Sequence, residues 1–320
     1  DALLSRGLGD VYKRQLLIAF SSLVAQDIKG KVFFDYTDNS GDGSKVDEFA
    51  LKRVYLTFSK SISDELSVTI QTDVDTNSSP KNIYLKNAKV DWKTLDGNIV
   101  IGLQGMNMFK IQERNWGKRY LDKTIMDRFK YSSAADMGIG YYHSKDKFHG
   151  SLLITNGAGY KKSENDSHKK LSLQFIYGNT NLSKSDGFNV GAVLSHEPYN
   201  RDGEVGIPEE PIGEHTKKVF GLFGGYAKNN LRVGVEWNQL DDSGLLDGNY
   251  DNNLTSVYCT YFLNPKQTLL VKHDMVSGNK DANYGLVAME FAPTKGLVVA
   301  PNVRSNDGTT SLGVNFQFQF

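Results

Sequence analysis

The chain has 320 residues, and its 37 basic and 37 acidic side chains give a formal net charge of zero. This balance argues against a nucleic-acid partner, for which a basic excess is the usual footprint. The single cysteine, Cys259, excludes an intramolecular disulfide and a zinc site built from several cysteines. Tyrosine (16), phenylalanine (17) and glycine (31) are abundant. Because aromatic side chains fit pleated surfaces, this composition favours strands over helices.

The first 26 residues differ in character from the rest. Residues 16–25, LLIAFSSLVA, form a short apolar run that follows Lys13 and Arg14. A basic flank, an apolar run and small residues are typical of a secretory signal peptide, and the run is about half as long as a membrane-spanning helix. We therefore expect residues 16–26 to be a signal-peptide remnant, with a buried helix as the alternative. Residues 1–15 lack an initiating Met, and we expect them to be a non-native scar.

After residue 27, segments of about ten residues alternate between apolar and polar side chains. This period of two predicts strands with one apolar and one polar face. The predicted strands cover residues 28–37, 48–60, 64–75, 83–94, 97–106, 136–144, 147–156, 168–179, 187–197, 216–228, 230–239, 254–263, 266–276, 282–292, 296–305 and 309–320.

The connections between these strands alternate in length. Short ones have the sequences SISD, KDK, KNN, NPK and PTKG, whereas residues 38–47, 107–135, 157–167, 198–215 and 240–253 form long ones. A transmembrane barrel carries tight turns on one rim and long loops on the other. We therefore predict an all-β fold in which residues 27–320 form a single transmembrane antiparallel β-barrel of about 16 strands, with a soluble β-sandwich as the alternative.

The alternation also assigns the two faces of each strand. In residues 53–58, Val54, Leu56 and Phe58 share one face and Arg53 lies on the other; Lys272 and Asp274 share a face of residues 266–276. Sixteen strands leave an aqueous channel, so we expect the apolar faces to meet lipid and the polar faces to line the lumen. The basic candidates for the lumen wall are Arg53, Arg232, Lys272 and Arg304.

The third long connection, residues 107–135, is the longest and carries seven basic and three acidic side chains. It also contains Phe109, Trp116 and Met126, and we expect a loop this apolar to fold inward, pack on the wall and narrow the pore. Basic groups in a low-dielectric constriction raise the local concentration of anions. The candidates for the constriction are Lys110, Arg114, Lys118 and Arg119. Pairing with local acids such as Glu113 is the alternative.

Three segments carry a resemblance to a known family: residues 49–75 (FALKRVYLTFSKSISDELSVTIQTDVD), residues 113–142 (ERNWGKRYLDKTIMDRFKYSSAADMGIGYY) and residues 295–304 (KGLVVAPNVR). Their order and spacing resemble the porin superfamily of bacterial outer membranes, most closely the phosphate-selective porin O/P family. The resemblance covers most of residues 27–320 and implies a sixteen-stranded homotrimer with an inward third loop. A full ladder of lumenal arginines cannot be placed in this chain, so phosphate selectivity and general diffusion of small solutes both stay open.

The last ten residues, SLGVNFQFQF, alternate strictly. We expect Leu312, Val314, Phe316, Phe318 and Phe320 on the lipid face, and we expect this strand to pair with the first one, near residues 29–37, so that no edge is left. A terminal aromatic on such a strand resembles the signal that the outer-membrane assembly machinery reads. The candidates for this signal are Phe316, Phe318 and Phe320.

Two loop features suggest cation binding, but the sequence supports this less than it supports the barrel. Asp38, Ser40 and Asp42 occupy alternate positions of a partial calcium loop, but Phe49 stands where a ligating Glu is expected, so a plain external loop is the alternative. Residues 199–215 and 239–253 each carry a net charge of −4. They are expected to be a solvated rim or to bind divalent cations shared with lipopolysaccharide.

Catalysis has little support in the sequence. The six histidines are scattered, and Ser195 and His196 are adjacent strand residues that point to opposite faces. We expect no enzymatic activity and no cofactor. Outward aromatic residues can instead form girdles at the membrane interfaces; the candidates are Trp92, Tyr141, Trp237, Tyr258 and Tyr261.

Together these features predict a bacterial outer-membrane porin for passive diffusion of small hydrophilic solutes. A preference for anions is compatible with this prediction. Its expected partners are the lipid bilayer, lipopolysaccharide, the assembly machinery and further copies of itself. The alternatives are a channel specific for phosphate or other anions, and a non-conducting structural or adhesive barrel.

Overall fold

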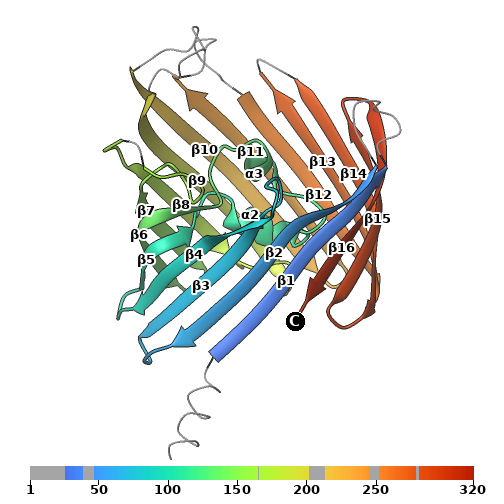
Figure 1. Ribbon diagram of the computed structural model, residues 1–320, viewed down its shortest axis with the longest axis horizontal. Helices are drawn as coiled ribbons and strands as arrows, with labels where there is room; N and C mark the ends of the chain where they lie inside the picture. Colours follow the sequence, from blue (N-terminus) through green and yellow to red (C-terminus); the bar gives the residue numbers. More distant parts are fainter. Residues whose placement is uncertain (1–25, 39–46, 165, 202–212, 245–251, 279–280) are drawn as a thin grey trace, which may run out of the picture.

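The computed structural model describes residues 26–38, 47–164, 166–201, 213–244, 252–278 and 281–320 (Figure 1). In these residues sixteen antiparallel strands follow one another around a closed barrel, and the last strand pairs with the first. The strands are β1 (Gln26–Asp38), β2 (Glu48–Ser61), β3 (Leu66–Asp75), β4 (Asn82–Lys93), β5 (Asn98–Gly105), β6 (Ala135–Lys145), β7 (Phe148–Thr155), β8 (Lys170–Gly178), β9 (Gly187–Arg201), β10 (Gly213–Lys228), β11 (Leu231–Asp242), β12 (Asn252–Asn264), β13 (Gln267–Ser277), β14 (Ala282–Thr294), β15 (Leu297–Asn306) and β16 (Thr309–Gln319). The predicted all-β barrel and its strand number are confirmed.

Two short helices, α2 (Lys110–Trp116) and α3 (Ile125–Arg128), lie in the connection between β5 and β6. Figure 1 shows both inside the barrel. Among the described residues, no helix combines the length and the apolar character that crossing a membrane requires. The predicted scar and signal-peptide remnant lie in residues 1–25, outside the described residues, apart from Gln26 at the start of β1.

The barrel closes through the terminal strand, as predicted. The β1–β16 register pairs Lys31 with Gln319 and Phe34 with Phe316, whose rings stack with centroids 4.6 Å apart. Beyond this ladder, the Phe320 N–H donates to the Gly30 carbonyl over 3.1 Å, and the Gly30 N–H donates back over 3.0 Å. A Cβ at Gly30 would come within 2.2 Å of the Phe320 ring, so glycine leaves the space in which the terminal ring packs.

The two faces of the wall differ in the sense expected of a barrel in lipid. In β13, Leu269, Val271 and Met275 point outward and are 36–41% exposed, whereas Lys272 and Asp274 point inward and are 1% exposed. A soluble sandwich would place its polar face in outside water. Here the outward face is the apolar one, and each backbone ladder is paired within the barrel, which is the arrangement that a bilayer interior demands.

The rims separate most connections by length, with exceptions on both rims. On the lower rim of Figure 1, the turns between β6 and β7, β10 and β11, β12 and β13, and β14 and β15 contain two residues each. On the opposite rim, Asp307 and Gly308 form an equally tight turn between β15 and β16, in place of a long loop. On the short-turn rim, residues 179–186 form an eight-residue connection between β8 and β9.

The predicted aromatic girdle is partly wrong. Trp92, Tyr141 and Tyr261 are exposed on the outer wall close to the short-turn rim, and Trp237 packs against Phe220. Tyr258, however, points into the barrel and is buried. The physical reason is the strand period of two: residues 258 and 261 are an odd number of positions apart in β12, so they face opposite sides.

Candidate pore constriction

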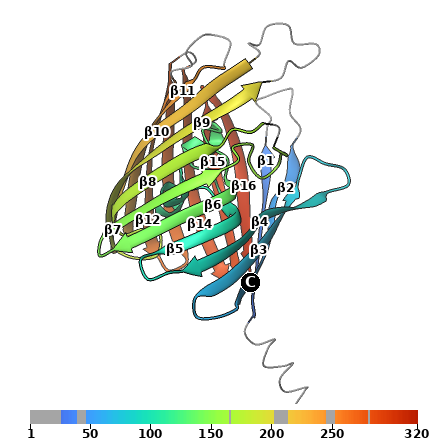
Figure 2. The same ribbon diagram turned by 90° about the vertical axis from the view of Figure 1, so that its left-hand side faces the viewer.

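The connection between β5 and β6 folds into the barrel and packs on the wall, as the sequence predicted (Figures 1 and 2). Its side chains Met108, Ile125 and Met126 are fully buried. Each such side chain contributes about 1.5–3 kcal/mol by leaving water, so burial of several holds the loop firmly. The cluster contains Met108, Phe109, Ile111, Ile125, Met126 and Tyr131 from the loop and Ile176, Val193, Val219, Phe223, Leu240, Leu254 and Val276 from the wall.

A second apolar cluster holds the following part of the loop. Trp116, Tyr120 and Leu121 pack against the wall residues Tyr258, Leu270, Tyr284, Leu286 and Ala288, together with Phe33 and Ala300. The Trp116 indole N–H donates to the Asp122 carbonyl over 3.0 Å, which closes the turn after α2. The loop therefore covers the inner wall formed by β8 to β15 and leaves most of β1 to β4 uncovered.

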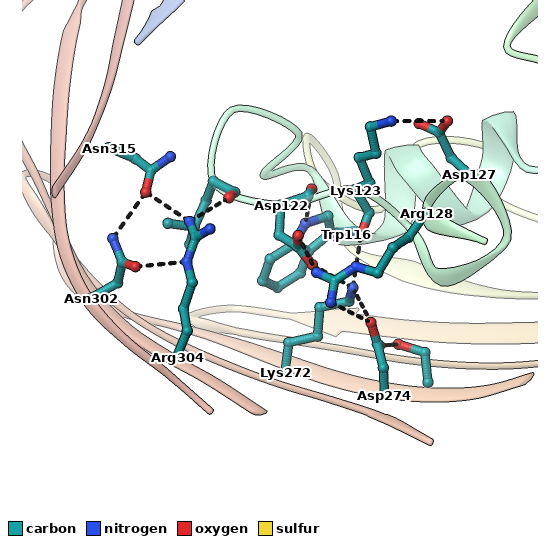
Figure 3. Close-up of polar contacts among 12 residues, drawn as sticks. Trp116, Asp122, Lys123, Asp127, Arg128, Lys272, Asp274, Asn302, Arg304 and Asn315 are labelled. Carbon is teal, nitrogen blue, oxygen red and sulfur yellow. Dashed lines mark hydrogen bonds and ion pairs between the residues drawn. The ribbon is translucent and has the colours of Figure 1, made fainter. Parts of the chain in front are cut away.

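Beneath the loop lies a buried ion cluster centred on Lys272 of β13 (Figure 3). Its ammonium donates to Asp122 Oδ2 over 2.6 Å, to Asp274 Oδ2 over 2.8 Å and to the Lys123 carbonyl over 2.7 Å. Arg128 pairs with Asp122 and places its guanidinium 3.5 Å from the centre of the Tyr284 ring. Two cations thus meet two carboxylates, and this neutrality makes the burial of all four charges tolerable.

The electrostatics of this cluster set the protonation of Asp122 in the loop. Burial alone would raise the pKa of the carboxyl group, but Lys272 and Arg128 outweigh burial and hold the pKa of Asp122 below its usual value. Asp122 is therefore ionised at neutral pH and ties the loop to β13.

Two more predicted basic residues also anchor the loop. Lys118 donates to both oxygens of Glu290 on β14, over 2.8 and 2.7 Å, and the Tyr120 hydroxyl donates to the same carboxylate over 2.7 Å. Arg304 of β15 donates to the Leu121 carbonyl over 2.9 Å and to Asn315 over 2.8 Å (Figure 3). Lys118, Lys272 and Arg304 all point into the barrel, but each is engaged in holding the loop.

Arg119, Lys110 and Arg114 have a different environment. Arg119 lines the open lumen and pairs with Glu113 and, over 2.8 Å, with Asp127, so it ties α2 to α3. Lys110 and Arg114 are exposed on α2, and within the described ranges neither makes an ion pair. Of the four predicted constriction residues, Lys118 and Arg119 are thus bound to carboxylates. Lys110 and Arg114 make no ion pair with any residue that the structure describes.

The open part of the lumen is a passage between the loop and the wall of β1 to β4. It has a volume of about 900 Å³. The described residues that line it include six basic side chains (Lys29, Lys31, Lys86, Lys110, Arg119 and Lys295) and two acidic ones (Asp27 and Glu113). Both acids are paired, Asp27 with Lys29 and Glu113 with Arg119. Lys86 lies 3.9 Å from the Asp73 carboxylate. The passage is therefore positive, and Lys31, Lys110 and Lys295 are the lining cations without an ion pair among the described residues.

Sequence analysis missed three of these lysines. Lys31 lies an even number of residues from Phe33 in β1, so the face assignment that was applied to Arg53 would also have placed it inside. For Lys86 alternation gives no single answer, because the β3–β4 register shifts next to it and it is an even number of residues from both the inward Tyr84 and the outward Trp92. Lys86 donates to the Tyr55 hydroxyl over 3.0 Å. Lys295 sits in the turn between β14 and β15, where alternation says nothing.

The remaining wall candidates, Arg53 and Arg232, are both engaged in ion pairs. The β2–β3 ladder ends at the pair Leu56–Thr72, and beyond it Asp73 accepts from Arg53 over 2.9 Å and from the Val54 N–H over 3.2 Å. The Arg53–Asp73 ion pair thus connects β2 and β3 beyond the end of their backbone ladder. Arg232 pairs with Asp186 over 3.1 Å near the short-turn rim.

The weaker predictions concern metal and catalysis. Ser40 and Asp42 lie outside the described residues, as do residues 202–212 and 245–251 of the acidic segments 199–215 and 239–253. Within the described ranges no group of three potential metal ligands occurs. Ser195 is buried on the inner face and His196 is exposed on the outer face, so the two do not form a nucleophile–base pair.

Comparison with known proteins identifies the fold of the chain. No family model and no curated protein matches the chain. Solved structures do match: OmpT, an outer membrane protein of Vibrio cholerae in a trimer form, is 14% identical with a TM-score of 0.68 over 92% of this chain and 99% of that one. The chain has the porin fold. An anion-selective porin from Comamonas acidovorans is 11% identical (TM-score 0.65; 92% and 99% covered), and Salmonella typhi OmpF in complex with daunomycin is 14% identical (TM-score 0.64; 92% and 97% covered).

OmpT is an outer membrane protein, and this chain shares its fold. The resemblance to the porin superfamily is confirmed at the level of fold. The narrower assignment to the phosphate-selective O/P family is not confirmed by any of these structures.

Proposed function

We propose that this chain is a passive channel of the bacterial outer membrane that admits small hydrophilic solutes and prefers anions. One observation carries the proposal: the open passage beside the loop is lined by six basic and two acidic side chains. Positive groups between low-dielectric walls attract anions and repel cations. No reaction takes place; width and charge select the solute. The similar fold of an anion-selective porin supports this reading.

The alternatives have less support. Arginine can bind two oxygens of a phosphate with its planar fork, whereas lysine acts as a point charge. The lining cations without an ion pair among the described residues, Lys31, Lys110 and Lys295, are lysines, which favours a general anion preference over a dedicated phosphate channel. A plugged structural or adhesive barrel would have no passage, whereas here the loop fills only one side of the lumen.

We also propose that the chain assembles as a homotrimer in contact with lipopolysaccharide, because an outer-membrane neighbour of this fold has a trimer form. Phe316, Phe318 and Phe320 are proposed to serve as the assembly signal. Phe318 and Phe320 are exposed side by side on the outer wall, with ring centroids 6.0 Å apart.

The test is the reversal potential of single channels in a planar bilayer under a KCl gradient. We expect stepwise conductance with a potential of the sign that favours chloride, and a smaller potential for Lys110→Gln with Arg114→Gln. Lys266→Gln, in the exposed turn between β12 and β13, is the control and should match the wild type. A silent bilayer would reject the channel, and a zero potential would reject the anion preference.

A further inference from the structure

A row of amide and hydroxyl side chains crosses the open wall of the passage on β2, β3 and β4. In the backbone register Thr57 is paired with Gln71, and Gln71 with Asn87. The Asn87 amide donates to Gln71 Oε1 over 2.8 Å, and the Gln71 amide donates to Thr57 Oγ1 over 2.7 Å. All three side chains are half-buried and line the passage. These three residues are called the amide row below.

The amide row keeps hydrogen-bonding groups for a solute. A side-chain amide nitrogen carries two N–H groups, of which Gln71 and Asn87 each use one within the row. The second N–H of each amide, the Asn87 oxygen and the Thr57 hydroxyl proton have no partner among the described residues. These groups both donate and accept, as the hydroxyls of a sugar do, whereas the oxygens of a carboxylate only accept. The row therefore suits a solute that carries hydroxyl groups.

Two lysines and a tyrosine lie next to the amide row on the same wall. Lys31 of β1 is paired with Tyr55 of β2, and side chains directly opposite in such a ladder have Cβ atoms about 4.5–5.5 Å apart. The Tyr55 hydroxyl accepts from the Lys86 ammonium over 3.0 Å, and its own proton has no acceptor among the described residues. All three side chains line the passage. Because Tyr55 is two residues from Thr57, both face the same side of β2, so this group adjoins the row.

The acids near these cations do not cancel their charge. Asp73 lies 3.9 Å from the Lys86 ammonium, but it also accepts from Arg53 over 2.9 Å, so one carboxylate meets two cations. Lys31 makes no ion pair among the described residues. Glu113 of α2, which lines the same passage, is itself paired. The wall beside the amide row thus carries an excess of positive charge.

We propose that Lys31, Tyr55 and Lys86 form, together with the amide row, a subsite for polyhydroxylated carboxylates, the class of the sugar acids. The two lysines and the Tyr55 hydroxyl donate to the carboxylate, and the amide row exchanges hydrogen bonds with the hydroxyls of the solute. A carboxylate without hydroxyls displaces water from the row and does not replace its hydrogen bonds, and a neutral sugar gains nothing from the lysines. The inference rests on the proposed channel function and names the solute class.

The experiment measures block of the chloride current by gluconate, hexanoate and glucose in single-channel recordings of the full chain. Gluconate carries a carboxylate and hydroxyls, hexanoate the carboxylate alone, and glucose the hydroxyls alone. We expect gluconate to block at the lowest concentration, about five-fold below hexanoate. This is the factor that corresponds to one hydrogen bond of about 1 kcal/mol, because about 1.4 kcal/mol is a factor of ten.

Two variants separate the halves of the subsite. Asn87→Ala should raise the half-blocking concentration of gluconate about five-fold and leave that of hexanoate unchanged. Lys31→Gln should raise both about five-fold, the factor expected of one unit charge about 4 Å from the anion in water. Thr69→Val is the matched control: Thr69 lies on β3 with its hydroxyl 3.4 Å from that of Ser59, is not among the described residues that line the passage, and should change neither concentration. Heat-modifiable gel migration confirms that each variant is folded.

Equal block of the wild type by gluconate and hexanoate, or an Asn87→Ala channel that gluconate blocks as it blocks Thr69→Val, would overturn the subsite while leaving conductance and anion preference intact. Block by glucose as strong as block by gluconate would overturn it too, because the lysines would then contribute nothing. A silent wild-type bilayer would instead reject the channel itself.

Discussion

The two sides of the lumen use charge in opposite ways. Where the loop covers the wall, the charged groups are buried and balanced: Lys272 and Arg128 meet Asp122 and Asp274, and Lys118 meets Glu290. Along β1 to β4 the lumen is open, and three lysines of its lining, Lys31, Lys110 and Lys295, make no ion pair among the described residues. An inward basic residue in a barrel can therefore have either of two roles. It holds the loop where it pairs with a buried carboxylate, and it attracts anionic solutes where it has no such partner.

The largest effect is expected on the covered side. Lys272→Met removes one cation and leaves Asp122 and Asp274 buried with Arg128 alone, which should cost about 3–5 kcal/mol. The unfolding temperature in detergent, measured by heat-modifiable migration, should fall, and the loop should become sensitive to trypsin. Lys266→Met, in an exposed turn, is the control. A variant as stable as the wild type would show that the ion cluster does not hold the loop.

Apolar packing on the covered side should matter nearly as much. Met126 is fully buried between loop and wall, and Met126→Ala should destabilise the protein by about 2–5 kcal/mol because it leaves a cavity. Met137→Ala removes the same atoms from the exposed outer wall and should have a much smaller effect. Equal losses in the two variants would contradict a tightly packed loop.

The stability that the ion cluster on the covered side contributes should decrease at acid pH, whereas the open side should show no such decrease. Because the pKa of Asp122 is held below its usual value of 3.8, its contribution is present above that pH and is lost as the pH falls through the lowered value. The difference in unfolding temperature between wild type and Asp122→Asn should be constant from neutral pH down to about 4 and shrink below it. A difference that shrinks already between neutral pH and about 5 would contradict the ion pairs.

On the open side we expect the smallest change in stability and the clearest change in transport. Lys110→Gln with Arg114→Gln should alter stability by less than about 0.5 kcal/mol, because both side chains are exposed. The same pair should reduce the preference for anions. Lys118→Gln should do the opposite: lower stability by freeing Glu290, with less effect on selectivity. Reversed results would mean that the two sides have been assigned the wrong roles.

Much of the fold was predictable because the strand period of two is a local property. It placed sixteen strands and pointed Arg53, Lys272 and Arg304 inward. Partners were not predictable: Lys272 and Asp122 are 150 residues apart, and Lys118 and Glu290 are 172 apart. A local pattern carries no information about such distant pairs.

Two signals for the site were present but not used. In β13 both faces carry apolar residues, with Leu269 outside and Leu270 inside; an apolar inner face shows where a loop must cover the wall. The segment NTNLSKSD, residues 179–186, is too long for a tight turn, and its single apolar residue, Leu182, is the one that is buried and anchors the connection between β8 and β9.

The most direct test of where solutes pass is thiol modification during single-channel recording. In a Cys259→Ala background, Gln71→Cys places a thiol in the open passage beside Thr57 and Asn87, whereas Thr260→Cys places one on the covered wall of β12. A negatively charged thiol reagent should reduce the current through the Gln71→Cys channel and leave the Thr260→Cys channel unchanged. Rapid modification at position 260 without any at position 71 would contradict the account.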